Sequence, residues 1–321
     1  MHRVTGQPGF IDLALQAAGL GANSELEAIA NTFDWKPIDA IVSVIYSARD
    51  GRPSYPSLVM VKALLLQQWY ALSDVRLEFM LRDSLSFRRF VGLAADDGTP
   101  DHSVVSRFRK ALGERGLDRQ LFEEVTRQLE AKGLILKTGT ILDATLVTAA
   151  VRKPSIKEGR GATSPLDPDA NFTRKNGKSY FGYKAHIAVD EGSGIIRDNV
   201  LTPAKTSESE MADGLIAGDE RAVYADKAYE KKERRRRLKS MGIKDRIMHR
   251  SHKHQARLPH WQAQRNRLIA SVRAAVERPF GTFKRCYGYV RVRYVGLARN
   301  AVHLNLLCLA FNMRKAANLA G

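Results

Sequence analysis

The stretch GTILDATLV, residues 139–147, is where the pattern of this 321-residue chain changes from helical to extended. Its alternating and β-branched residues predict a β-strand. Asp143 lies in the middle of that strand, on the same face as Ile141 and Thr145, and not at a turn. An unpaired carboxylate on a strand face is costly to bury, so Asp143 is the first candidate for a functional residue.

The residues after this strand predict the rest of an α/β domain. We expect a hairpin from YKAHIAVD and GIIRDNVLTPA around EGSG, and a helix with an acidic first turn from SESEMADGLIAG. AVYAD predicts a short buried strand ending on Asp226, followed by the basic helix of KAYEKKERRRRLKS and the strand of IKDRIMH. A right-handed crossover makes the AVYAD strand parallel to the first one, so we expect Asp143 and Asp226 to lie side by side. The Pro-, Gly-, Ser- and Lys-rich segment from Arg152 to Ser179 predicts a flexible loop that faces a ligand.

The residues before Gly139 predict helices. SYPSLVMVKALLLQQWYALS and SDVRLEFMLRDSLSFRRFVGL carry apolar residues at helical spacing. GTPDHSVVSRFRKAL has turn residues followed by an apolar helix face, with Arg107, Arg109 and Lys110 expected to point outward. This pattern fits a helix-turn-helix that binds DNA and, equally, a helical bundle with a basic outer face. The sequence therefore predicts an all-α domain over 1–135 and an α/β domain over 136–321.

The charge of the chain is large and unevenly placed. Lys+Arg 52 against Asp+Glu 34 give a formal net charge of +18. From Arg246 to the C-terminus there are fifteen Lys and Arg but one acid, Glu277. A basic surface from which acids are excluded is typical of proteins that bind a polyanion, so nucleic acid is the expected partner.

Several classes of protein are disfavoured. The longest apolar-rich segment, LNLLCLAFNM, is too short to span a bilayer, and we expect a cytoplasmic, nucleoid-associated protein without a membrane partner. Two cysteines give neither a disulfide framework nor a paired zinc motif. Without cysteine pairs, a zinc site is also not expected at the basic segment's histidines, His249, His252, His254 and His260.

Glu277 belongs to VRAAVERPFGTFKR, which predicts a helix in which Arg273 and Lys284 share its face. The residues expected to face the core are Leu268, Val272, Ala275, Val276 and Phe280. If Glu277 lies near the two aspartates, three carboxylates repel one another unless a cation is bound, and hard oxygen ligands suit Mg²⁺. Two such ions about 4 Å apart activate an attacking oxygen and stabilise a leaving one at a phosphodiester.

Each acid also has a simpler interpretation. Asp143 is compatible with a strand aspartate bonded to a nearby arginine, and Asp226 with a cap of the helix that follows it. Glu277 and Arg273 are compatible with a surface ion pair of small energetic value. From spacing alone, the metal site and these structural roles stay open.

The motifs in this order resemble the DDE transposases of bacterial insertion sequences, and most of all the insertion-sequence family numbered five. The third motif has the form R-x-x-x-E-x-x-x-x-x-x-K, with Ala270 in the place of the tyrosine that often opens it. YFGYKAH…VD…SG and VLTPA are similar to the family's second and third strands, and the helical segment from about Tyr55 is similar to the domain before its catalytic core. The acidic motifs are Asp143 in ILDATLV, Asp226 in YADKAY, and Glu277 between Arg273 and Lys284.

The resemblance implies a ribonuclease-H-like mixed sheet flanked by helices, preceded by the all-α domain. It implies that Asp143, Asp226 and Glu277 bind two Mg²⁺, with Mn²⁺ able to substitute, and catalyse strand cleavage and transfer. The implied partner is double-stranded DNA, as terminal inverted repeats and as target, bound by a homodimer. Expected phosphate contacts are Arg273, Lys284, Lys227 and Lys184, with Tyr229 and His186 beside them, although solvent-facing strand residues are an equal alternative. Expected contacts to the DNA ends are Arg107, Arg109 and Lys110.

Two other functions remain to be distinguished from transposition. One is a sequence-specific DNA-binding regulator whose C-terminal half is only structural. The other is a plain nuclease of the same fold, which hydrolyses strands and never joins a 3′-hydroxyl to a target.

Overall fold

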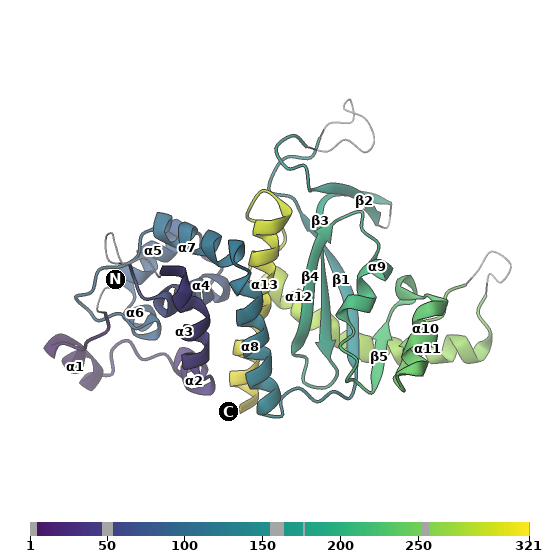
Figure 1. The fold of residues 1–321 in the computed structure, drawn as a ribbon, viewed down its shortest axis with the longest axis horizontal. Helices are drawn as coiled ribbons and strands as arrows, with labels where there is room; N and C mark the ends of the chain where they lie inside the picture. Colours follow the sequence, from purple (N-terminus) through teal and green to yellow (C-terminus); the bar gives the residue numbers. More distant parts are fainter. Residues whose placement is uncertain (1–4, 47–53, 155–163, 176, 252–256, 321) are drawn as a thin grey trace. The chain divides into compact units, whose positions relative to one another are not determined.

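The computed structural model describes residues 5–46, 54–154, 164–175, 177–251 and 257–320. The chain divides into two compact units (Figure 1). The first contains residues 1–131 together with 305–321, and the second contains residues 132–304. In the described ranges, no helix is both long enough and apolar enough to cross a membrane.

The first unit is helical, as the sequence predicts. α4 is its central helix, with nearly all side chains buried, and the end of α13 packs in the same unit. The Trp69 indole donates a hydrogen bond to the Ala310 carbonyl at 2.8 Å, and Asn305 donates to Asp118 at 2.6 Å. Its helices are α1 (Phe10–Ala17), α2 (Ser24–Thr32), α3 (Trp35–Ser43), α4 (Ser57–Trp69), α5 (Asp74–Asp83), α6 (Leu85–Val91), α7 (His102–Glu114), α8 (Leu117–Ala131) and the end of α13 (Leu297–Ala320), with the short η1 (Val44–Tyr46).

α7 is the helix that the sequence predicts to be basic on its outer face. The Asp101 side chain caps it by accepting the backbone N–H groups of Ser103 and Val104. Arg107 and Lys110 are exposed, as expected. The expectation for Arg109 is wrong, because its side chain is only 6% exposed. α7 packs against α4 and α5, and there the Arg109 guanidinium pairs with Asp74 and donates to Gln67 at 3.0 Å.

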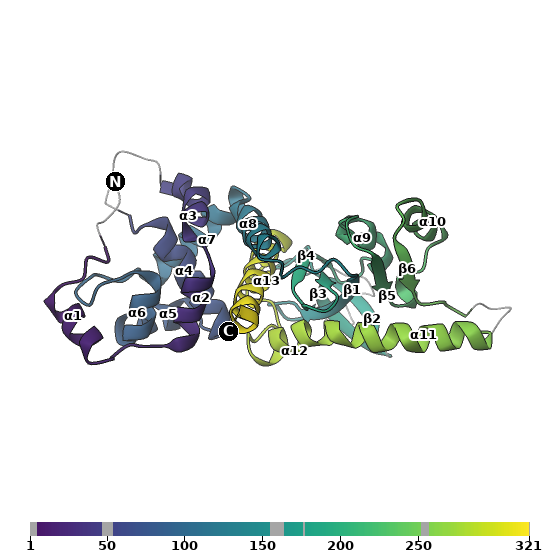
Figure 2. The same ribbon diagram turned by 90° about the horizontal axis from the view of Figure 1, so that it is seen from below.

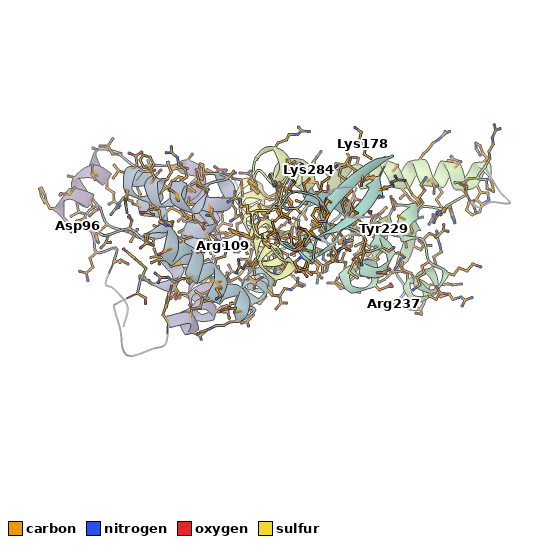
Figure 3. The ribbon with its side chains drawn as sticks, turned by 90° about the horizontal axis from the view of Figure 1, so that it is seen from above. Asp96, Arg109, Lys178, Tyr229, Arg237 and Lys284 are labelled. Atoms are coloured by element: carbon orange, nitrogen blue, oxygen red, sulfur yellow. The ribbon has the colours of Figure 1, made fainter. Side chains whose placement is uncertain are left out.

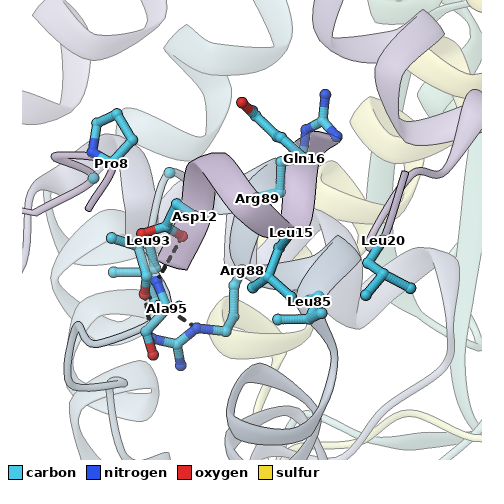
Figure 4. A pocket seen from close by; sticks show the side chains of 13 residues that line it. Pro8, Asp12, Leu15, Gln16, Leu20, Leu85, Arg88, Arg89, Leu93 and Ala95 are labelled. Carbon is cyan, nitrogen blue, oxygen red and sulfur yellow. Dashed lines mark hydrogen bonds between the residues drawn. The ribbon is translucent and has the colours of Figure 1, made fainter. Parts of the chain in front are cut away.

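A small pocket lies between α1 and the end of α6 (Figure 4). The buried Arg88 guanidinium there donates to backbone carbonyls, including that of Ala94 at 3.2 Å through Nε. Asp12 accepts the backbone N–H of Ala95 at 2.9 Å. These polar groups are occupied by bonds within the chain, so we assign the pocket a structural role.

The second unit is built on a six-stranded mixed sheet in the order β2-β3-β1-β5-β6, with β4 also paired to β3. β3 is antiparallel to β1, β2 and β4, whereas β5 is parallel to both β1 and β6. The predicted hairpin and the predicted parallel pairing of the AVYAD strand are therefore confirmed. The strands are β1 (Thr140–Thr148), β2 (Asn171–Lys175), β3 (Lys178–Asp190), β4 (Ile196–Pro203), β5 (Ala222–Ala225) and β6 (Lys244–Ile247).

Part of the segment from Arg152 to Ser179 forms β-structure, where its composition predicts a loop. Residues 171–175 form β2 and pair with residues 178–182 of β3. The ring centroids of Phe172 and Phe181 lie 4.9 Å apart across this pair, which gives the hairpin an apolar contact. Residues 155–163 of the expected loop lie outside the described residues.

Helices cover both faces of the sheet (Figure 2). α9 (Glu208–Leu215) and α10 (Lys232–Ser240) cover one face, and Leu142, Val223 and Leu238 lie in the apolar core on that side. α11 (His260–Arg273) and α12 (Glu277–Arg285) run along the other face. Because side chains alternate along a strand, the neighbour of Leu142, Asp143, faces the side of α11 and α12.

Candidate active site

Asp143 and Asp226 occupy equivalent positions on two parallel strands. β1 and β5 pair with Ile141 opposite Tyr224, and an aspartate follows two residues later in each segment: Asp143 within β1 and Asp226 directly after β5. The ladder itself ends at that pair, and Asp226 is the first residue after β5. The two carboxylates thus project from adjacent strands on the same side, as the crossover argument predicts.

The charges at this place act on each other. Asp143 is partly buried, and burial raises its pKa; the Arg273 guanidinium opposes this shift, and the charge of Asp226 adds to it. The net effect is a pKa above the usual range of an aspartate. A site where burial and a second acid both disfavour the charged form of Asp143 is a favourable place for a bound cation.

Two bonds connect β1 to the helices on this face. Arg273 Nη2 lies 3.4 Å from Asp143 Oδ1, so the simple interpretation of Asp143 as an arginine-paired aspartate describes a real contact. Lys284 Nζ donates to Thr145 Oγ1 at 2.6 Å, and Thr145 lies on the same strand face as Asp143. Burial, with the charge of Lys175 as a second cause, lowers the pKa of Lys284. The first and last residues of the R-x-x-x-E-x-x-x-x-x-x-K motif are therefore both fixed beside the first aspartate.

Asp226 also has the local role that its position suggests. Its Oδ1 accepts the backbone N–H of Ala228 at 2.6 Å, which caps the short η3 helix (Lys227–Tyr229). A capping bond to one oxygen leaves the other oxygen for a different ligand. The capping role and a role at the site are thus compatible, and they are separated by experiment below.

Glu277 stands between Arg273 and Lys284, but not on one continuous helix as expected. α11 ends at Arg273, the 3₁₀ turn η4 (Ala274–Val276) packs against β1, and α12 begins at Glu277 itself. Pro279 explains the break, because a proline has no N–H to donate and is tolerated only in the first turn of a helix. The Glu277 side chain is exposed and makes no ion pair among the described residues, which disfavours its interpretation as one half of a surface salt bridge with Arg273.

The predicted core face of this helix is also only partly correct. Val276 and Phe280 are buried, but the Leu268 side chain is 66% exposed. The face turned to the sheet changes at η4, so residues on opposite sides of the break do not keep a single helical register.

The residues expected to contact phosphate differ in their exposure to solvent. Lys227 is exposed beside Asp226. Lys184 is only 9% exposed, and its ammonium donates to the Thr206 carbonyl at 2.8 Å, so it does not face solvent; its contact with a phosphate stays a prediction. His186 is fully buried and hydrogen-bonded to Thr202 at 2.9 Å; burial lowers its pKa to about 3, which keeps the ring neutral.

Lys175 and Glu208 are two residues near the site that the sequence did not single out. Lys175 is exposed at the end of β2, and its charge acts on Asp143, Glu208 and Lys284. Lys175 lies in the segment that the sequence predicts to be a loop. The only signals for a ligand there are the positive charge of Lys175 and the length of the segment. Glu208 is the first residue of α9. From the sequence, an acid at this place is explained by the helix dipole, which favours negative charge in the first turn of a helix.

The donor set fits a divalent cation in its chemistry, because Asp143 and Asp226 offer hard carboxylate oxygens from adjacent strands. Within the residues whose placement is given, no three His, Cys, Asp or Glu side chains are gathered closely enough to share an ion. Asp143 and Asp226 come from adjacent strands, and the η4 turn just before Glu277 packs against β1, but the three acids do not form one cluster among the described residues. His252 and His254 lie outside the described residues.

Two family models match the chain. The one described as a transposase DDE domain covers residues 135–313, and the one described as a transposase domain (DUF772) covers residues 16–111. Among solved structures, the piggyBac transposase synaptic complex with hairpin DNA is 11% identical, with a TM-score of 0.40, and the match covers 92% of this chain and 78% of that one. The Mos1 strand transfer complex is 12% identical, with a TM-score of 0.20, over 77% of this chain and 82% of that one. The assignment rests on the first family model, which spans more than half of the chain: this protein belongs to the transposases with a DDE domain.

Proposed function

We propose that this transposase binds the terminal inverted repeats of its own element, cleaves them with the help of Mg²⁺, and joins the freed strand to a target. The observation that carries the proposal is the matched position of Asp143 and Asp226 on two parallel strands, with Arg273 beside the first. Mn²⁺ is expected to substitute for Mg²⁺, because it accepts the same oxygen ligands.

Asp143 and Asp226 would hold the metal ions, and Glu277 would supply the third carboxylate. When bound, the ions supply activation of the attacking oxygen and stabilisation of the leaving oxygen. Arg273 holds the Asp143 carboxylate in place through its ion pair. The support for Glu277 is its place in the chain, since the residues on either side of it in the motif are bonded to Asp143 and to Thr145.

Basic residues around the acids would hold the DNA backbone. Lys227 is exposed next to Asp226, and Lys175 is exposed within electrostatic reach of Asp143. Lys284 is partly buried and lies on α12 (Figure 3). These side chains would orient a phosphodiester at the carboxylates, while Lys184 belongs to the interior of the unit. On DNA we expect a homodimer, because an element has two ends to be cut, and we expect the protein to reside with bacterial DNA in the cytoplasm.

The experiment that tests the function is a cleavage and strand-transfer assay on labelled DNA carrying the inverted repeats that flank the gene. The proposed function predicts nicked ends and joined products that appear with Mg²⁺ and disappear with EDTA. Binding without any cleavage would support the DNA-binding regulator, and hydrolysis without joined products would support the plain nuclease.

DNA binding is expected to weaken steeply with salt. The basic C-terminal segment would displace counterions from several phosphates. We therefore predict that the logarithm of the association constant falls with the logarithm of the salt concentration, with a slope of about −4 or steeper, from roughly −0.9 per phosphate contact. Fluorescence anisotropy of a labelled end between low and physiological salt measures it. An affinity that does not change with salt would contradict a phosphate-bound complex.

The exposed basic residues of α7 are expected to contribute to binding of the DNA ends. Replacing Arg107 and Lys110 with alanine removes two outward charges and no buried contact, so the fold should persist while the salt slope falls by roughly 2. The matched control is Arg127→Ala, which removes an exposed arginine of α8 that pairs with Glu124. Equal affinity and equal salt slope in the folded double variant would assign α7 a structural role only.

A further inference from the structure

α1 carries an apolar stripe that faces solvent. Phe10, Leu13, Ala14 and Ala17 follow one another at the spacing i, i+3, i+4 and i+7, which places these four residues, the α1 stripe, on one side of the helix. All four are exposed, and the Phe10 and Leu13 side chains are 88% and 56% exposed. An apolar stripe at this spacing is the face with which a helix normally packs against a core or another helix. The part of the chain that the structure describes does not cover it.

The opposite side of α1 is fixed to its unit. The Asp12 carboxylate accepts the backbone N–H of Ala95 at 2.9 Å, and both Asp12 and Leu15 line the small pocket against α6 (Figure 4). Before the helix, the backbone N–H of Gly6 donates to Asp97 Oδ2 at 2.7 Å. These contacts set the orientation of α1 on its unit and turn the α1 stripe outward.

The sequence around α1 carries no positive charge. From Val4 to Trp35 there is no Lys or Arg, which is the longest run without either residue in a chain that contains 52 of them. A surface that binds DNA needs these residues to neutralise phosphates, and helices that lie on membranes usually carry them on their polar face. DNA and an anionic membrane are therefore poor partners for the α1 stripe, whereas a protein surface suits it.

We propose that the α1 stripe is a contact between two copies of this chain, with α1 of one copy packed against α1 of the other. The inference rests on the proposed homodimer and names its contact surface. Two copies with a net charge of +18 each repel one another, so a neutral stripe in the segment without Lys or Arg is where they approach at the lowest electrostatic cost. The same stripe on both copies makes the contact self-complementary about a two-fold axis, and the small Ala14 and Ala17 allow the helix axes to come close.

The size of the contact predicts when the dimer forms. α1 has 8 residues, and two such helices bury less than the about 1,200–2,000 Å² of a stable protein interface. We therefore expect weak association of the free protein. Two copies bound to one DNA molecule that carries both inverted repeats are held at a high effective concentration, which strengthens a weak contact.

Leu13→Glu in the full-length protein tests the contact on DNA with one or with both inverted repeats. We expect cooperative binding of the wild type to the two ends, and a loss of cooperativity of at least about tenfold in the variant, because each copy loses a buried leucine. Affinity for a single end and thermal stability should not change, since Leu13 is exposed within one copy. The control is Val75→Glu, which makes the same charge change at a 63% exposed apolar residue of α5.

Cysteine pairing tests the geometry directly. In a Cys286→Ser background, which leaves only the buried Cys308, Leu13→Cys is expected to give disulfide-linked dimers under mild oxidation on DNA with both ends. The middle of α1 lies nearest the two-fold axis in the proposed contact, so the two thiols can meet there. Val75→Cys in the same background should remain monomeric.

The outcomes separate this inference from the proposed function. Unchanged cooperativity in folded Leu13→Glu, or no linked dimer from Leu13→Cys, would overturn the inference, while strand transfer by the wild type would leave the proposed function intact. Unchanged cooperativity together with binding of phosphatidylcholine vesicles that Leu13→Glu abolishes would assign the α1 stripe to a lipid surface. If Leu13→Glu does not fold, Phe10→Glu replaces it under the same criteria. If the wild type neither binds nor cuts the repeats, the proposed function fails, and linked dimers of Leu13→Cys at high protein concentration without DNA still decide the contact.

Discussion

Asp226→Asn is expected to abolish cleavage and strand transfer, by on the order of 10³-fold or more, while the protein stays folded and bound to DNA. A loss of this size is typical when a group that stabilises charge in the transition state is removed. The substitution is discriminating because asparagine caps a helix about as well as aspartate does. The bond from the Ala228 N–H to Oδ1 is therefore kept, and only the anionic ligand is lost.

The matched control for Asp226 is Asp219→Asn. Asp219 precedes β5, whereas Asp226 follows it, and the Asp219 carboxylate pairs with Lys137 at 2.9 Å and with Arg197. Its loss should cost some stability and leave the chemistry nearly unchanged. Near wild-type cleavage by Asp226→Asn would show that capping is the whole role of Asp226 and would remove it from the site.

Glu277→Gln is expected to have a comparable effect on activity. The variant keeps the size of the side chain and removes its charge, so a purely surface role would cost at most about 1 kcal/mol of stability. A metal-ligand role predicts loss of cleavage and joining in both Mg²⁺ and Mn²⁺. DNA affinity should persist or rise, because a negative charge beside the phosphates has been removed.

Glu233→Gln provides the control for Glu277, because Glu233 is an exposed acid in the first turn of another helix of the same unit. Cleavage and DNA binding are measured in parallel on the same labelled ends. If Glu277→Gln cuts and joins DNA normally while Asp143→Asn and Asp226→Asn are both inactive, the third acid of the site is not Glu277.

The features that were predictable from the sequence are those carried by short-range patterns. Alternation and β-branching gave the strand around Asp143 and the hairpin after it. The connection rule then gave the parallel neighbour that ends at Asp226. These inferences needed no knowledge of which distant residues pack together.

The features that were missed depend on distant partners or on a break in periodicity. Arg109 is buried because Asp74 and Gln67, far away in the chain, accept its hydrogen bonds. Lys184 is likewise turned inward by Thr206 and Glu208. The end of α11 at Arg273 was foreseeable from Pro279, whose missing N–H does not allow an uninterrupted α-helix through that point.

The most direct test of the central claim is strand transfer by the wild type and by Asp143→Asn on DNA that carries the element's inverted repeats, with Mg²⁺ present. If Asp143, Asp226 and their metal ions form the active site, the wild type will produce joined strands that EDTA prevents. Asp143→Asn will bind the same DNA and produce none. Joined products from the folded Asp143→Asn variant, or from the wild type in EDTA, would contradict the account.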